Sequence, residues 1–191
     1  MGGKAIPWES QIEKDFIALA EMDPTVREIY AQPLRVGYEI NGVRHTYVPD
    51  FALVTAERTE IHEVKPDDAA DELQAVFAAI APVFAKDGLV FCISRESAIR
   101  VQQRLKNVWA LWRELHVRVP ATEELRALSA IGDRPGIRIC DLGVPGHLVH
   151  ALVAQGSLRV ALDKPLSASS SVWLPSDFPY EERLVPFHPV R

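Results

Sequence analysis

The sequence predicts an α/β fold in which a mixed β-sheet is flanked by helices, followed by a small C-terminal domain. An amphipathic helix precedes two strand-like runs around Asn41-Gly42, a dipeptide that is the strongest short-range signal for a β-hairpin. A further strand and helix follow, and residues 89–93 form a continuous apolar run typical of a buried strand. This alternation of strand and helix patterns indicates one sheet covered by helices.

The N-terminal half divides into five predicted elements. A helix begins at Ser10, where Ser10 and Glu13 fit the capping-box pattern, and ends near Asp23-Pro24. Glu13 lies on the margin of the apolar stripe of this helix, so it either caps its own helix or faces the sheet. The other elements are a hairpin over residues 34–40 and 43–54, a strand over 59–65, a helix over 67–85 and the buried strand at 89–93.

The C-terminal half changes in composition after residue 119. A helix over 97–115 is followed by helical segments at 121–128 and 147–154, a strand-like run at 137–142, and a pairing of 158–162 with 172–174. Helices followed by a small hairpin suggest a winged-helix-like module. We therefore expect a first domain at 1–118, a winged-helix-like, partner-binding domain at 119–174, and a proline-rich extended tail at 175–191 that packs along the body or on a partner.

Composition places the chain among globular proteins. It has 191 residues, of which 48% are hydrophobic, enough for one ordinary domain with a small appendage. No run approaches the roughly 18 apolar residues of a membrane span, and residues 1–8 lack the apolar stretch of a secretory signal. We expect a soluble, cytoplasmic protein without membrane contact. Cys92 and Cys140 lie far apart in strand-like settings, which favours reduced, buried thiols over a disulfide or metal site.

The net charge of −5 bears on the kind of partner. Lys and Arg contacts to phosphates supply most non-specific affinity for nucleic acid, so either DNA is not the substrate or a partner delivers it. The segment from 95 to 118 is locally basic and contains three candidate DNA contacts, Arg100, Arg104 and Lys106. A basic helix is also common as a merely solvated surface.

Pro49-Asp50 and Glu63-Val64-Lys65 form the most informative pattern. On a strand, Glu63 and Lys65 point to one face while Val64 points to the other. Phosphodiester hydrolysis uses a divalent ion held by carboxylates such as those of Asp50 and Glu63, and Lys65 could orient the water and offset charge on the phosphate. The alternative is that Pro-Asp marks an ordinary turn and Glu-x-Lys an exposed strand.

The element order and this site resemble the restriction-endonuclease-like core with its PD-(D/E)xK motif. Residues from Trp8 to Leu174 further resemble the TnsA family, the endonuclease subunits of heteromeric DNA transposases. The residues that carry this resemblance are Trp8, Glu9, Ser10, Glu13, Phe16, Asp23, Pro24, Val26, Gln32, Pro33, Tyr38, 47–51, 63–65, 73–75, Phe77, 105–107, 151–158, Pro165, Leu166 and 172–174.

The resemblance implies a function and a site. The function is nicking at each transposon end to free the 5′ ends, beside a separate DDE-type transposase and an ATP-dependent regulator, leaving a 5′-phosphate and a 3′-hydroxyl. Glu13, Asp50 and Glu63 fall on the metal-binding acids and Lys65 on the catalytic lysine. We expect Mg²⁺, with Mn²⁺ as a substitute, held by Asp50, Glu63, the Val64 main-chain carbonyl and Glu13. Some family members carry glutamine at the position of Glu63, and an acid there suits Mg²⁺ more directly.

Two rival functions stay open at this point. One is a stand-alone PD-(D/E)xK nuclease of a phage or defence system, which would act without partners. The other is a non-catalytic assembly adaptor of a transposition complex, whose nuclease-like core serves as scaffold. The intact set of Asp50, Glu63 and Lys65 makes the adaptor the least favoured of these functions.

Overall fold

The structure is a computed structural model that describes residues 6–132, 134–181 and 183–190. It divides into two compact units, the first formed by Met1–Val101 with Glu182–Arg191 and the second by Gln102–Glu181. The first unit is therefore built from two separated stretches of chain. The predicted limits at 118 and 174 both fall inside the second unit, and the last ten residues join the first.

The first unit contains a mixed sheet, as predicted, and this sheet has four strands in the described residues. Its strands lie in the order β1 (Val26–Ala31), β4 (Phe51–Thr55), β5 (Thr59–Lys65) and β6 (Val90–Arg95). Strand β4 is antiparallel to both β1 and β5, whereas β5 and β6 are parallel. Strand β1 was not predicted, because this edge strand contains two consecutive exposed charged residues, Arg27 and Glu28, and has no clear apolar run.

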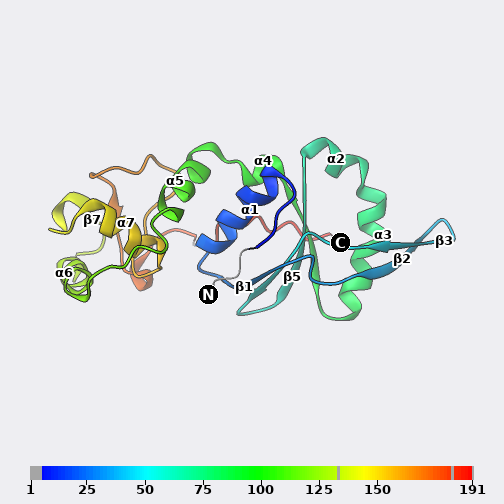
Figure 1. The fold of residues 1–191 in the computed structure, drawn as a ribbon, viewed down its shortest axis with the longest axis horizontal. Helices are drawn as coiled ribbons and strands as arrows, with labels where there is room; N and C mark the ends of the chain where they lie inside the picture. The colour runs from blue at the N-terminus through cyan, green and yellow to red at the C-terminus, as the bar shows by residue number, and fades with distance from the viewer. Residues whose placement is uncertain (1–5, 133, 182, 191) are drawn as a thin grey trace. The chain divides into compact units, whose positions relative to one another are not determined.

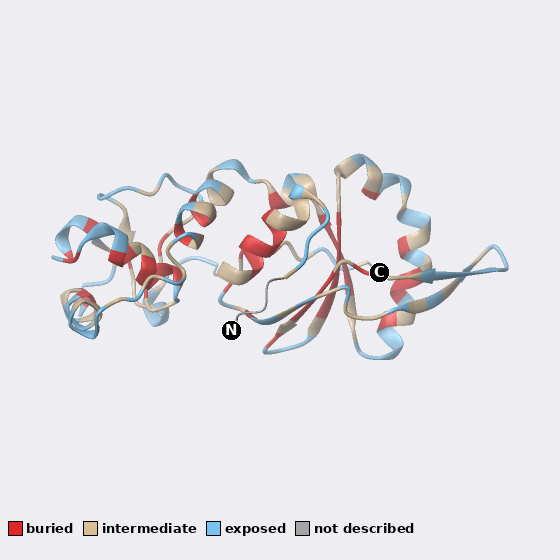
Figure 2. Cartoon of the chain, in the orientation of Figure 1, coloured by how far each residue is buried: buried red, intermediate tan, exposed pale blue. Residues whose placement is uncertain are grey.

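Helices cover both faces of this sheet (Figure 1). On one face α1 (Gln11–Met22) places Phe16 against Phe51 of β4, with ring centroids 5.3 Å apart. On the other face α3 (Gln74–Lys86) packs Phe77, Ile80 and Phe84 onto apolar residues of β5 and β6. Figure 2 shows the buried residues concentrated on the central strands and on the helix faces turned to them. The helices α2 (Asp67–Glu72) and α4 (Glu96–Ile99) are short.

The hairpin forms at the predicted turn. Strands β2 (Val36–Ile40) and β3 (Val43–Tyr47) are joined by Asn41 and Gly42, whose φ angles of 52° and 75° are those of a hairpin turn with two positive φ values. The predicted return strand over 43–54 is in fact two strands. It breaks at Pro49, which has no N–H for the ladder, and the chain then enters the main sheet as β4.

Two predicted helices are also interrupted. The helix expected over 67–85 divides into α2 and α3 at Leu73, and the one expected over 97–115 divides into α4 and α5 (Gln102–Trp112). The second break coincides with the boundary between the two units at Val101. Apolar periodicity identified the helical segments but could not place these breaks.

The end of the chain extends the main sheet. Pro189 forms an antiparallel bridge with Cys92 of β6, the Val190 N–H donates to the Phe91 carbonyl at 2.9 Å, and the Ile93 N–H donates to the His188 carbonyl at 3.2 Å. Residues 188–190 thus lie along the free edge of β6. The described part of the predicted extended tail packs on the body of the first unit from residue 183 onward, while residues 182 and 191 lie outside the described residues.

A buried polar network fixes this terminal segment. Arg183 donates to both carboxylate oxygens of Glu60, at 3.1 and 2.5 Å, and Glu60 is fully buried on β5. The neighbouring His62 contacts Glu60 at 3.1 Å and Ser94 at 2.9 Å. Asp23, at the end of α1, accepts hydrogen bonds from the backbone N–H groups of residues 184 and 185. These contacts make the end of the chain part of the first unit's core.

In the described residues of the second unit, three helices combine with a small sheet. The helices are α5, α6 (Ala121–Ile131) and α7 (Gly146–Ala154), with short 3₁₀ turns at Ile139–Asp141 (η1) and Pro175–Asp177 (η2). Strand β7 (Ile137–Arg138) pairs with β8 (Ser171–Val172), so the predicted pairing of 158–162 with 172–174 is reduced to one bridge between Arg159 and Trp173. The winged-helix arrangement stays a prediction.

Both cysteines are free, but only Cys92 is buried; the expectation of a buried thiol was wrong for Cys140, which is exposed on η1. None of the helices in the described ranges is long and apolar enough to cross a membrane.

Candidate active site

The pairing of β4 with β5 brings Asp50 to the Glu63-Val64-Lys65 strand. Phe51 lies opposite His62 in this antiparallel pair, so Asp50, one residue earlier, lies beyond the last paired residues. There its Oδ2 accepts a hydrogen bond of 2.8 Å from the Val64 N–H. The strand register, which sequence reasoning could not supply, thus places the Asp50 carboxylate against β5.

Lys65 joins the two predicted acids. Its Nζ lies 2.6 Å from Oε1 of Glu63 and 3.6 Å from Oδ2 of Asp50. Glu63 and Lys65 share the face of β5 that looks toward α3, whereas the neighbouring His62 contacts Phe16 of α1 on the opposite face. This is the alternation expected for a strand. Two carboxylates therefore converge on one ammonium group.

Burial makes this concentration of charge costly. The Glu63 side chain is only 6% exposed and that of Asp50 only 21%. Burial raises the pKa of Asp50 to about 6, and the Glu63 carboxylate adds to the rise, while Lys65 and the Val64 N–H oppose it. For Lys65, burial lowers the pKa but its contacts with Glu63 and Asp50 outweigh burial, so the pKa is raised and the amine stays charged.

Glu13 takes one of the two roles that the sequence left open, because it caps its own helix. Its backbone N–H donates to Oγ of Ser10 at 3.2 Å, and its carboxylate accepts from Ser10 Oγ and from the Glu9 N–H, each at 2.9 Å. Ser10 thus caps α1 as predicted, but the Glu13 carboxylate reaches back to the Glu9 N–H, whereas a capping box would use the N–H of Ser10. Its charge also raises the pKa of Asp50, although it is the last of five contributions. The charge of Glu13 is therefore felt by Asp50, while its carboxylate oxygens accept hydrogen bonds at the start of α1.

Tyr47 is a residue of the site to which sequence reasoning assigned no role. Its hydroxyl donates to Oε2 of Glu63, whereas the Lys65 Nζ lies 2.6 Å from Oε1. Burial raises the pKa of Tyr47 and the Glu63 charge raises it further, so the phenol stays a neutral donor. The sequence signal that could have pointed to Tyr47 was its position two residues before Pro49. Its partner, however, lies sixteen residues away, and only the folded arrangement shows it.

The donor set fits a hard divalent ion. Asp50 and Glu63 supply carboxylate oxygens, and two negative charges against one ammonium leave an excess of negative charge for a cation. The N–H and C=O of one strand residue face the same neighbour, so the Val64 carbonyl also points to the side of Asp50. In the described part of the chain no three His, Cys, Asp or Glu side chains already cluster as a metal site. Glu13 thus does not join the other two acids in a ready-made cluster.

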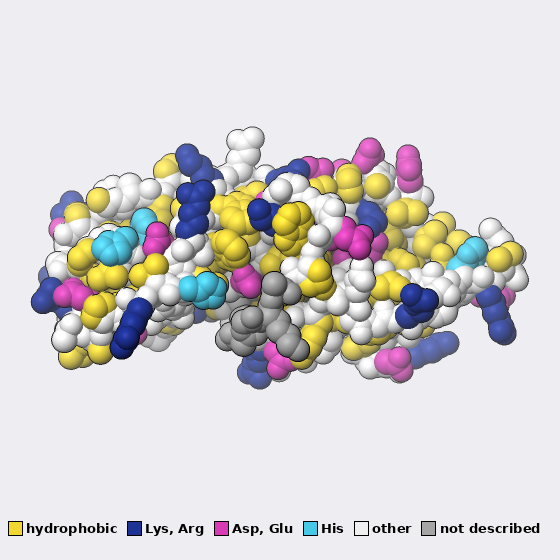
Figure 3. Space-filling view, viewed as in Figure 1, with side chains coloured by type: hydrophobic (Ala, Val, Ile, Leu, Met, Phe, Trp, Pro, Cys, Tyr) yellow, Lys and Arg dark blue, Asp and Glu magenta, His cyan; other side chains and the backbone are white. Residues whose placement is uncertain are grey.

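The three predicted DNA contacts differ in their surroundings. Arg100, in the first unit, pairs with Asp15 at 2.8 Å and with Glu96. Arg104, in the second unit, forms a two-pronged pair with Asp163. Lys106 is exposed, and within the described ranges it has no ion pair. In the view of Figure 3, Lys and Arg side chains are scattered among acidic and apolar ones, and acidic side chains gather over α2.

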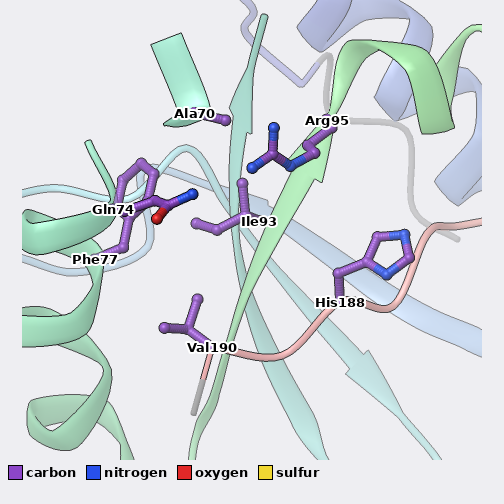
Figure 4. Close-up of a pocket in the computed structure, with 7 residues that line it drawn as sticks. All are labelled: Ala70, Gln74, Phe77, Ile93, Arg95, His188 and Val190. Carbon is purple, nitrogen blue, oxygen red and sulfur yellow. The ribbon is translucent and has the colours of Figure 1, made fainter. Parts of the chain in front are cut away.

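A pocket of about 330 Å³ adjoins the site on the α3 side of the sheet. Strand register places Ile93 beside Glu63 and Arg95 beside Lys65, and both line this pocket. Figure 4 shows Arg95 and Gln74 extending toward each other across Ile93. The Arg95 guanidinium donates to the Asp67 carbonyl and pairs with Asp71 at 2.6 Å, so its charge is already paired with an acid of α2.

Comparison with known proteins identifies the part of the chain that carries this geometry. Residues 23–96 match the family model described as TnsA-like endonuclease N terminal. No curated protein matches the chain. The matched range contains Asp50, Glu63, Val64 and Lys65, as well as Tyr47; Glu13, Arg100, Arg104 and Lys106 lie outside it.

Proposed function

Because residues 23–96 belong to the TnsA-like endonuclease N-terminal family, we propose that the chain is the DNA endonuclease subunit of a heteromeric transposase. It hydrolyses one phosphodiester bond at each transposon end to free the 5′ end, beside a DDE-type transposase and an ATP-dependent regulator. The observation that carries this proposal is the convergence of Asp50 and Glu63 on Lys65 within the matched range.

The metal would be held by Asp50, Glu63 and the Val64 carbonyl, with Glu13 reaching it directly or through water. Bound there, Mg²⁺ or Mn²⁺ would polarise the phosphate and make a water more acidic. Lys65 holds its proton at neutral pH, because its carboxylate contacts raise its pKa. Its ammonium orients the attacking water and offsets charge that develops on the phosphate. The products carry a 5′-phosphate and a 3′-hydroxyl.

The acidic balance of the chain supports a role within an assembly. With a net charge of −5, the protein has little electrostatic affinity of its own for DNA, so it does not nick at random. The transposase and the regulator deliver the transposon ends to it. The second unit, for which we propose a winged-helix-like fold, serves protein contact. Among the candidate DNA contacts, exposed Lys106 is best placed to reach a phosphate without first losing an ion pair.

Nicking of labelled transposon-end DNA in the presence of the transposase tests this proposal. Asp50→Ala and Lys65→Ala should each lower the rate by about 100-fold or more, as expected when a charged group is removed from a site where charge develops. Asp68→Ala and Lys86→Ala remove exposed residues of the same types and should leave the rate unchanged. If the two site variants nick as well as the parent, the site assignment is wrong.

The same preparations separate the rival functions. Robust cutting of plasmid DNA by the purified protein and Mg²⁺, without a transposase, would show a stand-alone nuclease. A protein that binds the transposase but never binds metal or nicks DNA would instead be an assembly adaptor.

A further inference from the structure

The side chain of Tyr47 is held in place independently of its hydroxyl. Its ring meets Phe91 of β6 edge to face, with centroids 6.1 Å apart and an interplanar angle of 88°. Tyr38, across the hairpin, meets it at 6.5 Å and the same angle. Aromatic pairs of this geometry stabilise one another beyond the area they bury. These ring contacts with Phe91 and Tyr38 therefore hold the phenol oxygen of Tyr47 beside Glu63.

The hydroxyl of Tyr47 gives the Glu63 carboxylate a second donor beside Lys65. Lys65 contacts Oε1 at 2.6 Å, while Tyr47 donates to Oε2. Rotation about the last bond of a glutamate side chain is soft, so one contact alone leaves the carboxylate plane loosely defined. Two donors on opposite oxygens define that plane. Each oxygen keeps a further lone pair, and these remaining lone pairs are the ones a cation beside Asp50 could use.

We propose that Tyr47 is a positioning residue, whose hydroxyl orients the Glu63 carboxylate to bind the divalent ion. This inference rests on the proposed function, because it assigns Tyr47 to the metal that Asp50 and Glu63 would hold. It adds a residue outside the Pro-Asp and Glu-x-Lys pattern to the site. Partners that orient metal ligands typically change metal affinity or activity by 10- to 100-fold when they are removed.

Tyr47→Phe is the decisive variant, because it removes the hydroxyl and keeps the ring on Phe91 and Tyr38. Tyr38→Phe is a matched control: it removes a hydroxyl from the same aromatic group, and within the described ranges the structure shows no hydrogen bond to the Tyr38 hydroxyl. Thermal unfolding of both variants without metal checks that each is folded.

Two measurements on the full chain test the inference. Titration calorimetry with MgCl₂ in the absence of DNA should show binding that is about 10-fold or more weaker for Tyr47→Phe and unchanged for Tyr38→Phe. In the nicking reaction with the transposase, Tyr47→Phe should lower kcat at fixed Mg²⁺, leave KM for the DNA unchanged, and recover partly as Mg²⁺ is raised.

The possible outcomes are distinct. If Tyr47→Phe binds Mg²⁺ and nicks like an active parent, this inference is overturned and the proposed function stands. Equal losses in Tyr47→Phe and Tyr38→Phe would also overturn it, since they would indicate a general effect of the aromatic group. A parent that neither binds Mg²⁺ nor nicks overturns the proposed function and this inference with it.

Discussion

The individual residues of the candidate site carry two carboxylates and one ammonium group, and all three side chains are largely buried. Asp50 and Glu63 share the single ammonium of Lys65, and Tyr47 adds only a neutral donor. Such an arrangement costs folding stability, and binding of a cation would relieve that cost. The excess negative charge thus destabilises the metal-free fold and favours the binding of a cation.

Asp50→Asn should stabilise the metal-free protein at neutral pH. The pKa of Asp50 is raised to about 6 from 3.8, so its ionised form is disfavoured in the folded state. The destabilisation is absent below the unfolded pKa and develops fully as pH rises through about 6. We expect the variant to gain up to about 3 kcal/mol in free energy of unfolding at pH 7.5 and less at pH 4.5.

Urea denaturation in the presence of a chelator measures this difference at both pH values. Asp87→Asn, which removes an exposed acid from the same unit, should change stability by less than about 0.5 kcal/mol. A destabilised Asp50→Asn protein at pH 7.5 would show that the contacts of Asp50 with Lys65 and Val64 outweigh its burial.

The two cysteines should react at very different rates. Burial raises the pKa of Cys92 to about 12, and the charge of Glu60 contributes to the rise, whereas Cys140 is exposed. Since the thiolate is the reactive form, a thiol reagent at neutral pH should modify one cysteine in the folded protein and both in denaturant. Peptide mapping identifies the modified residue, and rapid labelling of Cys92 in the native state would contradict the burial of β6.

At the scale of elements, the end of the chain is part of the first unit's sheet. Residues 188–190 form backbone hydrogen bonds with β6. In the segment before them, the backbone N–H groups of Leu184 and Val185 donate to the Asp23 carboxylate. Burial opposes the ionisation of Glu60, but hydrogen bonds from His62 and Arg183 outweigh it and hold the pKa of Glu60 below its ordinary value. The terminal segment therefore supplies a countercharge for a fully buried acid, beside Arg58, whose Nε lies 3.5 Å from Oε1 of Glu60.

Arg183→Ala should destabilise the protein by about 3–5 kcal/mol, because it leaves the Glu60 charge buried without its two-pronged partner. Arg95→Ala breaks a more exposed ion pair in the same unit and should cost about 1 kcal/mol or less. Urea denaturation provides both values. Equal costs would show that the Arg183 pair acts like an ordinary surface pair, and in the expected case Glu60→Gln should recover part of the loss in Arg183→Ala.

Across the whole molecule, the charge balance disfavours DNA binding by the chain alone. The chain carries 26 acidic against 21 basic side chains, and two of the three predicted DNA contacts, Arg100 and Arg104, are engaged in ion pairs. A protein with this charge gains little from the release of counterions around DNA. The site has the groups for hydrolysis, while the surface lacks the charge that concentrates substrate.

The purified protein alone should therefore bind duplex DNA more weakly than about 10⁻⁴ M at physiological salt, the weak end of ordinary non-specific binding. Fluorescence anisotropy with transposon-end and unrelated duplexes measures this affinity. Addition of the transposase should retain the protein on the end sequence. Tight binding by the protein alone would instead favour the stand-alone nuclease.

Much of the site could be read from local patterns. Strand periodicity placed Glu63 and Lys65 on one face, Asn41-Gly42 located the hairpin, and Ser10 with Glu13 located the start of α1. These predictions succeeded because each depends on backbone geometry within a few residues.

Contacts between distant segments could not be read in this way. The approach of Asp50 to Val64, the hydrogen bond from Tyr47 to Glu63, and the bridge from Pro189 to Cys92 each depend on strand order and register. Many registers are compatible with the same local preferences, and packing of the whole core selects among them. The sequence motif of Asp50, Glu63 and Lys65 thus identifies the chemical groups of the candidate site. The folded sheet determines the distances between these groups and brings Tyr47 to them.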